Sequence, residues 1–497
     1  MCAIVAVAVA PARAQDPGAG AGVPTAEEIL ARSRAATGGD RRPETERELW
    51  SARVAGLDGT LETLRRGTDT ASTMQFGPFR TARGIARGER WRQNENGETI
   101  VERAEPSQAE KPTAQTVARV RDPLDAWEVT TTFGSGHVQR LYYDVRTSYL
   151  VRSERTIAGH TTRTDFDDFR TDARGRTRPW HYAGGDDRRE NDFDYRLVRD
   201  DLGPAVTEND VAVPRDRRAL VEFPAGADTV RLPARIENDR VYVTLEIGGR
   251  ALDFLLDTGA SSITIDQSVA ASLGLPVYGR SVLTVAGAFE SGRVVVPLVT
   301  VGPLAMHDVA MRTAPYASSD ARDRRIVGLL GFDFLDACAI KLEYAAGTVE
   351  AIRPGSFVAP AGANALDVRL NSGAPVARAT VGDATGEDFI LDTGAAFGYV
   401  VFQRFARAHP AALAPARDGR THAGSGVGGS LLYRNVAPRR LTLGTSVLEA
   451  APGIEALAPN ALGFDNQDGL IGADILRRFT VYLDYAGARV YLAPPRP

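Results

Sequence analysis

The chain has 497 residues, of which 25% are charged and 43% hydrophobic, and its formal net charge is −4. This length exceeds one ordinary domain, and the slightly acidic balance disfavours binding to nucleic acid, which needs a basic surface. The two cysteines, Cys2 and Cys338, leave no internal disulfide once the apolar N-terminus is removed, so cysteine usage does not indicate a compartment.

The N-terminus is typical of an export signal. Residues 1–10 are apolar, and Ala12-Arg13-Ala14 has the small-x-small form of a signal-peptidase site. We therefore predict a signal peptide over residues 1–14 and a mature chain in the periplasm or outside the cell. The positively charged segment that usually precedes such a stretch is missing, so a start codon further upstream and a chance Ala-rich tail are both open alternatives. No apolar run of about 18 residues follows, which predicts no transmembrane segment.

Residues 25–220 are predicted to form a β-rich N-terminal domain that begins with one helix. Thr25 and Glu28 form a capping box, apolar positions recur after them at helical spacing, and Gly38 ends the pattern. Short β-type runs separated by turn residues follow, and they predict an antiparallel sheet. The clearest of these runs lie at 136–145, 149–154 and 161–170.

This helix followed by a meander of strands resembles the bacterial lipoprotein-carrier half-barrels, whose curved sheet holds acyl chains. The resemblance implies contact with lipid or lipoprotein through the N-terminal domain. A pro-segment, or a docking module for substrates, would have the same pattern. All four tryptophans lie before residue 220, which marks a change of composition, and we predict a linker over residues 221–231.

A short phrase occurs twice in the rest of the chain. Residues 255–260 read Leu-Leu-Asp-Thr-Gly-Ala, and residues 390–395 read Ile-Leu-Asp-Thr-Gly-Ala. Each copy starts as an apolar run typical of a buried strand, and the glycine after the aspartate favours a sharp turn. One copy alone would indicate an ordinary turn at the end of a strand. Because the phrase is repeated, we predict that Asp257 and Asp392 belong to one site.

The sequence around the two phrases is repeated as well. Gly-Leu-Leu-Gly-Phe-Asp-Phe-Leu at 328–335 recurs as Gly-Leu-Ile-Gly-Ala-Asp-Ile-Leu at 469–476. Strand patterns accompany both copies, at 241–247 and 374–381 before the phrases and at 340–344 and 481–485 after them. The repeat predicts two similar β-rich lobes, over residues 232–353 and 364–495.

These motifs resemble the aspartic peptidases, most closely the retropepsin-like (retroviral-type) branch, in which Asp-Thr-Gly-Ala is the active-site signature. The resemblance covers roughly residues 230–495 and implies a pseudo-dimer in which one chain supplies both halves of the site. The expected fold class is mainly β, with two homologous lobes preceded by an α+β domain that contains an antiparallel sheet. The resemblance makes Asp257 and Asp392 the catalytic carboxylates, and the reaction needs no metal or cofactor.

The resemblance also implies roles for the residues beside each carboxylate. The two threonines would interlock their hydroxyls with the opposite loop, and the two glycines would donate backbone N–H groups towards the carboxylates. Leu329-Leu330-Gly331 and Leu470-Ile471-Gly472 would brace the loops from below. The residues implied to support the active-site loops are Thr258, Gly259, Ala260, Thr393, Gly394 and Ala395.

Each lobe also has a candidate flap, the hairpin that covers an extended substrate and excludes water. Residues 282–294 of the first lobe read as two strands around a glycine-containing turn, at the distance after the first aspartate where the family places its flap. Residues 421–430 of the second lobe are richer in glycine. Ordinary surface hairpins would have the same patterns. The candidate flap residues are Ala286, Gly287, Ala288, Gly424, Ser425 and Gly426.

Paired carboxyl groups suit peptide hydrolysis for a physical reason. Two carboxyls within hydrogen-bonding distance cannot both ionise at little cost, so one pKa rises and the pair shares a proton. The ionised member can activate a water molecule, and the protonated member can stabilise the oxyanion that forms on the peptide carbonyl. We therefore predict an aspartic endopeptidase with protein or peptide substrates. The alternative is an exported protein that binds lipid, lipoprotein or peptide on the same scaffold without cleaving it.

Other reactive residues are predicted to have structural roles. The six histidines are scattered without metal-binding spacing, and no Gly-x-Ser-x-Gly elbow surrounds Ser261 or Ser262. Cys338 lies in an apolar stretch and is expected to be a packing residue. Asp333 and Asp474 form a second matched acid pair, each two residues after a bracing glycine at the start of a presumed helix, and we predict that they cap the first turn of that helix.

Overall fold

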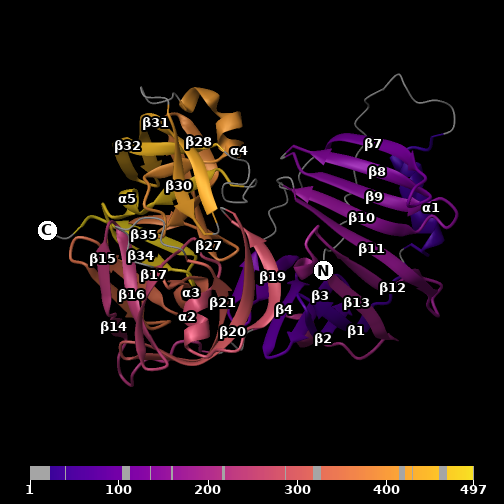
Figure 1. Cartoon of the computed structure of the whole chain (residues 1–497), viewed down its shortest axis with the longest axis horizontal. Coiled ribbons are helices and arrows are strands. Elements are labelled where there is room, and N and C mark those ends of the chain that lie inside the picture. The colour runs from indigo at the N-terminus through magenta and orange to yellow at the C-terminus, as the bar shows by residue number, and fades with distance from the viewer. Residues whose placement is uncertain are drawn as a thin grey trace.

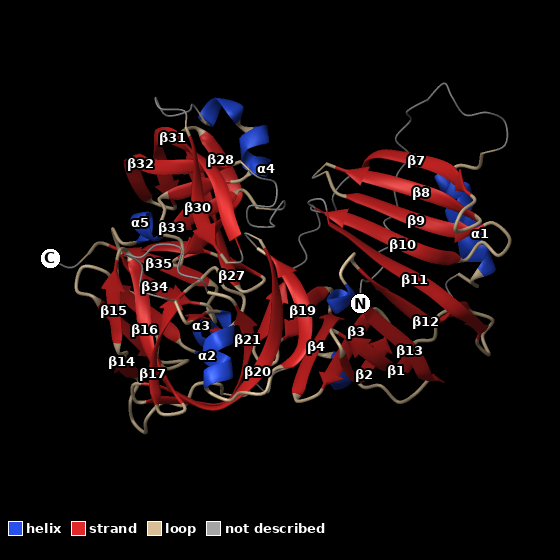
Figure 2. Cartoon of the chain, in the orientation of Figure 1, coloured by secondary structure: helices blue, strands red, loops and turns tan. Residues whose placement is uncertain are grey.

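The computed structural model describes residues 23–39, 41–102, 112–134, 136–157, 160–214, 219–285, 287–316, 326–413, 420–427, 429–457 and 467–495. The signal peptide predicted over residues 1–14 lies outside these ranges. The described chain is mainly β, and Figure 1 shows an N-terminal sheet beside two smaller lobes. Helices are short and few beside the strands (Figure 2). The predicted fold class is confirmed.

The N-terminal domain is one antiparallel sheet of thirteen strands within the described ranges, in the order β6-β5-β4-β3-β2-β1-β13-β12-β11-β10-β9-β8-β7. The predicted antiparallel meander is confirmed, because each neighbouring pair of described strands runs antiparallel. The strands are β1 (Thr45–Val54), β2 (Leu57–Arg66), β3 (Asp69–Phe76), β4 (Phe79–Ala86), β5 (Glu89–Gln93), β6 (Thr99–Glu102), β7 (Pro112–Val120), β8 (Ala126–Phe133), β9 (Val138–Asp144), β10 (Leu150–Ile157), β11 (His160–Thr171), β12 (Thr177–Gly185) and β13 (Phe193–Leu202).

The predicted N-terminal helix is present as α1 (Ala26–Ala36) and packs on this sheet. Thr25 and Glu28 form the capping box, with reciprocal hydrogen bonds of 3.2 and 2.8 Å between side chain and backbone. Ile29 of the helix is buried in one cluster with Val129 of β8 and Tyr143 of β9. Two short 3-10 helices, η1 (Arg189–Asn191) and η2 (Asn209–Val211), flank β13.

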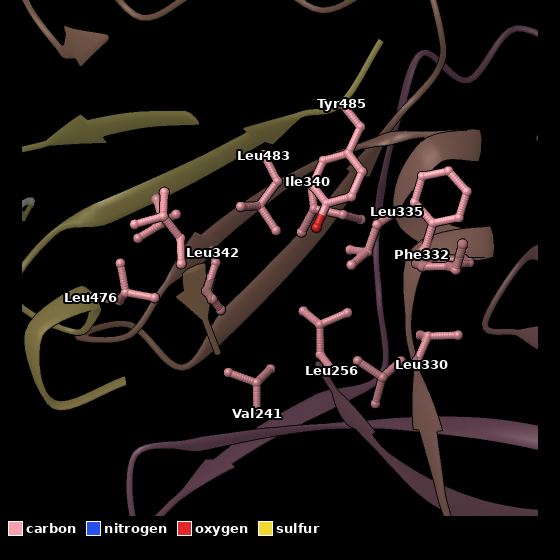
Figure 3. Close-up of a cluster of buried hydrophobic side chains, with 14 of the residues drawn as sticks. Val241, Leu256, Leu330, Phe332, Leu335, Ile340, Leu342, Leu476, Leu483 and Tyr485 are labelled. Atoms are coloured by element: carbon pink, nitrogen blue, oxygen red, sulfur yellow. The ribbon is translucent and has the colours of Figure 1, made fainter. Parts of the chain in front are cut away.

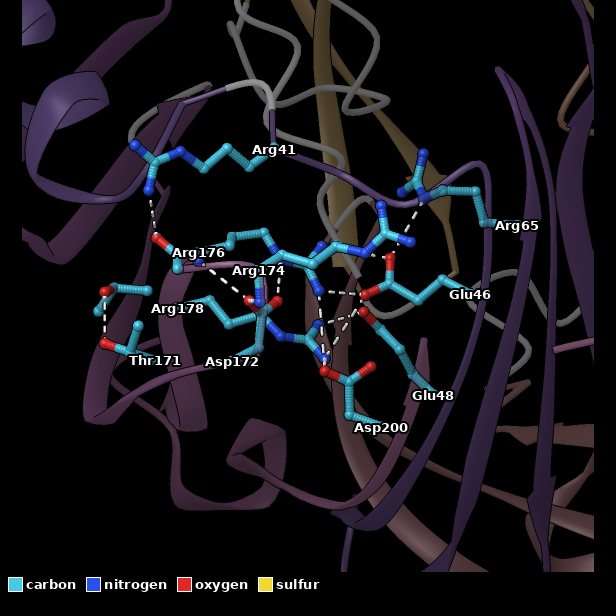
Figure 4. A network of polar contacts seen from close by, with 12 residues as sticks. Arg41, Glu46, Glu48, Arg65, Thr171, Asp172, Arg174, Arg176, Arg178 and Asp200 are labelled. Carbon is cyan, nitrogen blue, oxygen red and sulfur yellow. Dashed lines mark hydrogen bonds and ion pairs between the residues drawn. The ribbon is translucent and has the colours of Figure 1, made fainter. Parts of the chain in front are cut away.

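A network of arginines and carboxylates is largely buried among the central strands β1, β13 and β12 of the sheet (Figure 4). Arg176 pairs with Glu46 and lies 2.9 Å from Asp172, and Arg178 lies 2.5 Å from Asp200. Burying one of these charges alone would be costly, so each is stabilised mainly by its partners. The pKa of Glu46 is lowered despite its burial, because the guanidinium of Arg176 stabilises its ionised form.

The two lobes share one topology. The first lobe has the strand order β15-β16-β17-β22-β18-β21-β20-β19, and the second has β26-β27-β28-β33-β29-β32-β31-β30, each an eight-stranded sheet in the described residues. The predicted duplication is therefore confirmed strand by strand. The first sheet comprises β15 (Ala234–Glu237), β16 (Arg240–Ile247), β17 (Arg250–Leu256), β18 (Thr264–Asp266), β19 (Tyr278–Thr284), β20 (Ala288–Val301), β21 (Leu304–Ala314) and β22 (Gly328–Leu330). The second comprises β26 (Arg369–Asn371), β27 (Ala374–Val381), β28 (Ala384–Asp392), β29 (Tyr399–Val401), β30 (Thr421–Gly426), β31 (Gly429–Leu443), β32 (Ser446–Ala456) and β33 (Gly469–Gly472).

A third sheet joins the lobes. Its order is β14-β24-β23-β34-β35-β25, six strands among those described, and β23 of the first lobe pairs directly with β34 of the second. Part of the stretch predicted as a linker, residues 221–231, contributes β14 to this sheet. The strands are β14 (Thr229–Arg231), β23 (Ala339–Glu343), β24 (Thr348–Ile352), β25 (Asn364–Asp367), β34 (Thr480–Asp484) and β35 (Arg489–Ala493). The helices of the lobes are α2 (Gln267–Ser272), α3 (Phe332–Ala337), α4 (Gln403–Ala408), η3 (Pro410–Ala412) and α5 (Ala473–Leu476).

The core of the lobes continues across their junction (Figure 3). Leu256 and Leu330 of the first lobe, and Leu342 and Leu483 of the joining sheet, are each no more than 1% exposed. Burying a side chain of this size contributes about 1.5–3 kcal/mol to stability. Because Leu256 immediately precedes Asp257, this shared core fixes where the first active-site loop begins.

Candidate active site

Both candidate aspartates stand at the end of a central strand. β17 ends at Leu256, directly before Asp257, and β28 ends at Asp392 itself. β22 runs parallel to β17, and β33 runs parallel to β28. Each loop therefore starts at the end of a strand that is paired with a parallel neighbour. In the first lobe the backbone N–H of Asp257 donates to the carbonyl of Leu330 at 3.1 Å.

The two loops meet so closely that only glycine fits beside each opposite carboxyl. A Cβ added at Gly394 would lie 2.5 Å from Cγ of Asp257, and one at Gly259 would lie 2.9 Å from Cγ of Asp392. The two carboxyl groups also lie within hydrogen-bonding reach of each other. The structure thus brings together two carboxylates that are far apart in the sequence.

Burial raises the pKa of both carboxyl groups above the ordinary value of 3.8, and the neighbouring charge of Asp392 raises the pKa of Asp257 further. Backbone N–H groups act in the opposite direction because they stabilise the ionised form. Gly259 donates to Oδ1 of Asp257 at 2.8 Å, and Gly394 donates to Oδ1 of Asp392 at 2.8 Å. The pair therefore retains one proton at a pH where an isolated aspartate would be ionised.

We expect this pair to make stability depend on pH in one direction. A carboxyl whose pKa is raised by folding stabilises the folded state at low pH, and that contribution is lost as the pH rises through the raised pKa. Relative to Asp257→Asn, the native chain should therefore lose stability as the pH rises from about 4 towards neutrality. Thermal unfolding midpoints of both proteins over this range test the expectation. If the unfolding midpoints of the two proteins changed with pH in the same way, that result would contradict a raised pKa for Asp257.

The two threonines lock the loops together. Oγ1 of Thr258 donates to the carbonyl of Leu391 at 2.6 Å, and Oγ1 of Thr393 donates to the carbonyl of Leu256 at 2.8 Å. Each hydroxyl also accepts the backbone N–H of the opposite threonine, at 2.9 and 3.1 Å. Both side chains are at most 1% exposed. Four buried hydrogen bonds therefore hold the two halves of the site in one arrangement.

One glycine of each repeated motif, Gly331 or Gly472, packs closely against the active-site loop of its own lobe. A Cβ at Gly331 would lie 2.7 Å from the carbonyl oxygen of Ala260, and one at Gly472 would lie 2.6 Å from that of Ala395. The following residues, Phe332 and Ala473, donate backbone N–H groups to the same two carbonyls, at 3.0 and 2.8 Å. The absence of a side chain at these glycines permits the close approach.

The candidate flaps are hairpins at corresponding places in the two sheets. β19 and β20 pair up to Thr284 and Ala288, so Gly287 lies in the turn between them, while Ala286 lies outside the described residues. Gly424, Ser425 and Gly426 lie in β30, which pairs with β31.

Each loop is flanked by an apolar cluster, and the two clusters occupy matching positions. The first consists of Tyr242, Leu255, Ala314, Tyr316 and Leu329, and the second of Ala374, Val376, Ile390, Val400, Phe402, Ala456 and Leu470. Val427, from the turn after β30 of the second lobe, packs against the cluster of the first lobe. The β30–β31 hairpin of the second lobe therefore contacts the apolar cluster of the first lobe.

The outer strand of the first hairpin is bonded to the N-terminal domain. Asn191 of η1 accepts the N–H of Val282 at 2.8 Å and donates to its carbonyl at 3.0 Å, and Arg188 donates to the hydroxyl of Thr284 at 3.2 Å. Nearby, the N–H of Arg280 donates to the carbonyl of Ala55 at 2.8 Å. These contacts restrain an edge strand that would otherwise expose unpaired backbone groups.

Asn191→Ala is expected to loosen this strand without unfolding the domain. The change removes both side-chain bonds to Val282, so the amides of β19 should exchange with solvent about tenfold faster. Hydrogen exchange measured by mass spectrometry on peptides from β19 tests this. Asn209→Ala, an exposed asparagine of the same domain, is the matched control. Equal exchange in the two variants would show that Asn191 does not restrain the strand.

The prediction that Asp333 and Asp474 cap helices is wrong. The helices α3 and α5 begin after Gly331 and Gly472, and neither receives a side-chain cap. Asp333 is 1% exposed and instead accepts the backbone N–H of Ile263 at 2.6 Å, whereas Asp474 pairs with Arg477 at 2.7 Å. The sequence shows neither arrangement, because the partners of Asp333 lie in other elements.

Residues that sequence reasoning missed lie in the turn between β5 and β6. Asn94 and Asn96 donate to Oδ1 of Asp333 at 2.6 and 3.0 Å. No local pattern around these asparagines distinguishes them from ordinary turn residues. Cys338 is buried, and its pKa is raised by that burial, in keeping with a packing role. In the described ranges, no three His, Cys, Asp or Glu side chains are grouped so that they could hold a metal ion.

Comparison with known proteins gives one family match, in the first lobe, and two kinds of solved structure with low sequence identity. Residues 243–334 match the aspartyl protease family model, so the chain contains an aspartyl protease domain that includes Asp257. No curated protein matches the chain. The aspartic proteinase from Irpex lacteus has 14% identity over 54% of this chain and 97% of its own, with a TM-score of 0.34. A LolA superfamily protein from Nitrosomonas europaea has 11% identity over 38% of this chain and 97% of its own, with a TM-score of 0.27.

Proposed function

We propose that the protein is an aspartic endopeptidase that hydrolyses peptide bonds with Asp257 and Asp392 as its catalytic pair. The observation that carries the proposal is the approach of these two carboxyls across the lobe junction, with raised pKa values and each against a glycine of the opposite loop. Two acids buried against each other are costly to the fold, so their presence favours a chemical role.

The reaction follows from the shared proton. A water molecule held between the carboxyls loses a proton to the ionised member while its oxygen attacks the peptide carbonyl. The protonated member donates a hydrogen bond to the carbonyl oxygen as that oxygen becomes negative. Proton transfer to the leaving amine then completes the hydrolysis, and the dyad returns to its singly protonated state. The threonine bonds keep the carboxyls at a fixed separation throughout, which limits reorganisation during the reaction.

Substrates are proposed to be extended peptides with apolar side chains on either side of the cleaved bond. Partly buried hydrophobic residues beside the loops support this preference, because they give the two sides of the site an apolar surface; they are Ala260, Phe289 and Ile326 in the first lobe and Ala395, Phe397 and Ile454 in the second. The hairpins β19–β20 and β30–β31 would act as flaps. Val427, which already contacts the opposite lobe, supports closure of the second hairpin over the peptide.

The proposal also covers where the protein is located and what its N-terminal domain contacts. The apolar N-terminus with its Ala12-Arg13-Ala14 motif supports export, to the periplasm or the exterior. No helix among the described residues is long and apolar enough to cross a membrane. We propose that the N-terminal sheet contacts lipid or lipoprotein, which would place the peptidase near substrates that carry acyl chains.

The test is cleavage of an unbiased peptide library by the mature chain from acidic to neutral pH. It is run beside Asp257→Asn and in the presence of an inhibitor that mimics the tetrahedral transition state. Cleavage that both controls abolish is the expected result, and the cleaved sequences should show apolar residues at the scissile bond. A folded chain that cleaves nothing at any pH would overturn the proposal in favour of a binding protein on this scaffold.

A further inference from the structure

The turn that joins β5 and β6 in the N-terminal sheet inserts into the first lobe. Asn96 is 3% exposed, its amide donates to the carbonyl of Ala310 at 3.0 Å, and its own carbonyl oxygen accepts the N–H of Ala310 at 2.8 Å. Glu95 of the same turn pairs with Arg293 at 2.9 Å. β6, directly after the turn, lies against β26 of the second lobe, and its Ile100 belongs to the core cluster of the lobes.

Side chains of this turn donate hydrogen bonds to the carboxylate of Asp333, which supports the first active-site loop. Oδ1 of Asp333 accepts the side-chain amides of Asn94 and Asn96, and Oδ2 accepts the N–H of Ile263. Ile263 follows the loop of residues 257–262 directly. The loop is therefore held at its far end by a carboxylate that is itself held by the N-terminal domain.

The orientation of both asparagine amides is determined by their other bonds. Oδ1 of Asn94 accepts the N–H groups of Asn96 and Glu98, at 3.0 and 2.9 Å, and Oδ1 of Asn96 accepts from Ala310. Each asparagine must therefore present its NH₂ group to Asp333. Three N–H donors converge on this side chain, and a carboxylate satisfies all of them.

The second lobe holds its loop without such a support. Asp474 occupies the matching place after Gly472, but its side chain is 20% exposed and pairs with Arg477 of the next turn. Gly472 instead donates its N–H to the carbonyl of Gly398 at 2.7 Å, within the lobe. The two halves of the site are thus supported differently. Among the described residues, only the Asp257 loop is supported by bonds from the N-terminal domain.

We infer that Asn94 and Asn96 are positioning residues of the peptidase, through which the N-terminal domain sets the geometry of the Asp257 loop. This inference rests on the proposed function, and it makes the N-terminal domain a permanent part of the active site. It argues against a pro-segment that is removed on activation, because removal would leave Asp333 buried with two of its three donors lost.

The test compares Asn96→Ala with Asn209→Ala in the full-length chain. Hydrogen exchange is followed in peptides that cover residues 257–263 and residues 392–398, and kcat and KM are measured for a peptide cut by the native chain. For Asn96→Ala we expect exchange to rise about tenfold or more at 257–263 and to stay unchanged at 392–398. We also expect kcat to fall about 10- to 100-fold with KM nearly constant, because a small displacement of Asp257 affects chemistry more than binding.

Asn94→Ala provides the second variant, because it keeps the side chain of Asn96 and removes the other amide bond to Asp333, together with the two bonds that Asn94 accepts from the N–H groups of Asn96 and Glu98. If Asn96→Ala does not fold, Asn94→Ala should still give the same lobe-specific change with a smaller amplitude. Unchanged exchange at 257–263 together with unchanged kcat in the folded variants would overturn the inference. The exchange measurement does not require cleavage, so it remains decisive if the native chain proves inactive, and the two proposals can fail separately.

Discussion

Asp257→Asn and Asp392→Asn are each expected to lower kcat by at least about 10³-fold. An amide cannot accept a proton from water or share one with its neighbour, so either change leaves a single carboxyl, which cannot supply the base and the acid in the same step. The fold should remain, because asparagine has nearly the same shape as aspartate and avoids the cost of a buried charge. Steady-state cleavage of the best library peptide, with circular dichroism of each variant, measures both effects.

The matched control for these variants is Asp367→Asn. Asp367 lies in β25 with a side chain that is 83% exposed, and its contact with Arg489 is at the surface. Its replacement should leave kcat and KM unchanged, since exposed ion pairs contribute little. Activity that survives in either dyad variant at a level near that of Asp367→Asn would contradict the shared site.

Thr393→Val should destabilise the lobes by about 2–5 kcal/mol. Valine has the shape of threonine, so no cavity forms, but the N–H of Thr258 loses its acceptor and the carbonyl of Leu256 loses its donor. Both groups are buried at the lobe junction, where water cannot replace the missing hydroxyl. The denaturant midpoint of the variant, compared with that of the native chain, gives the size of the effect.

Thr380→Val is the appropriate comparison for this prediction. Thr380 lies on β27 in a half-buried position, and among the described residues its side-chain hydroxyl bonds only to the hydroxyl of Thr385, at 2.9 Å. Its replacement should cost less than about 1 kcal/mol. Combining Thr258→Val with Thr393→Val should cost less than the sum of the single changes, because the two hydroxyls belong to one network. An effect of Thr393→Val no larger than that of Thr380→Val would mean that the lobes do not depend on the interlock.

Three features of the site explain why so much of it could be predicted. The Asp-Thr-Gly-Ala phrase, the strand before it and the apolar-apolar-Gly motif after it all act locally, through strand pairing and a turn that needs glycine. Their duplication then indicated that the two halves meet. The capping role expected for Asp333 failed for the opposite reason. Its position after a glycine at a helix start is typical of a cap, but its side chain is buried and accepts three bonds from two other places in the fold, the β5–β6 turn and the residue before β18.

By itself, the sequence determined two repeated β lobes, the identity of the candidate dyad and a β-rich domain before them, because periodicity and turn residues act between near neighbours. Only the tertiary structure decided how these parts support one another. The bond from Asn94 to Asp333 spans 239 residues, and that from Asn191 to Val282 spans 91. Such contacts depend on how one sheet packs against another, and asparagine in a turn has the same local pattern whether it faces solvent or a buried carboxylate.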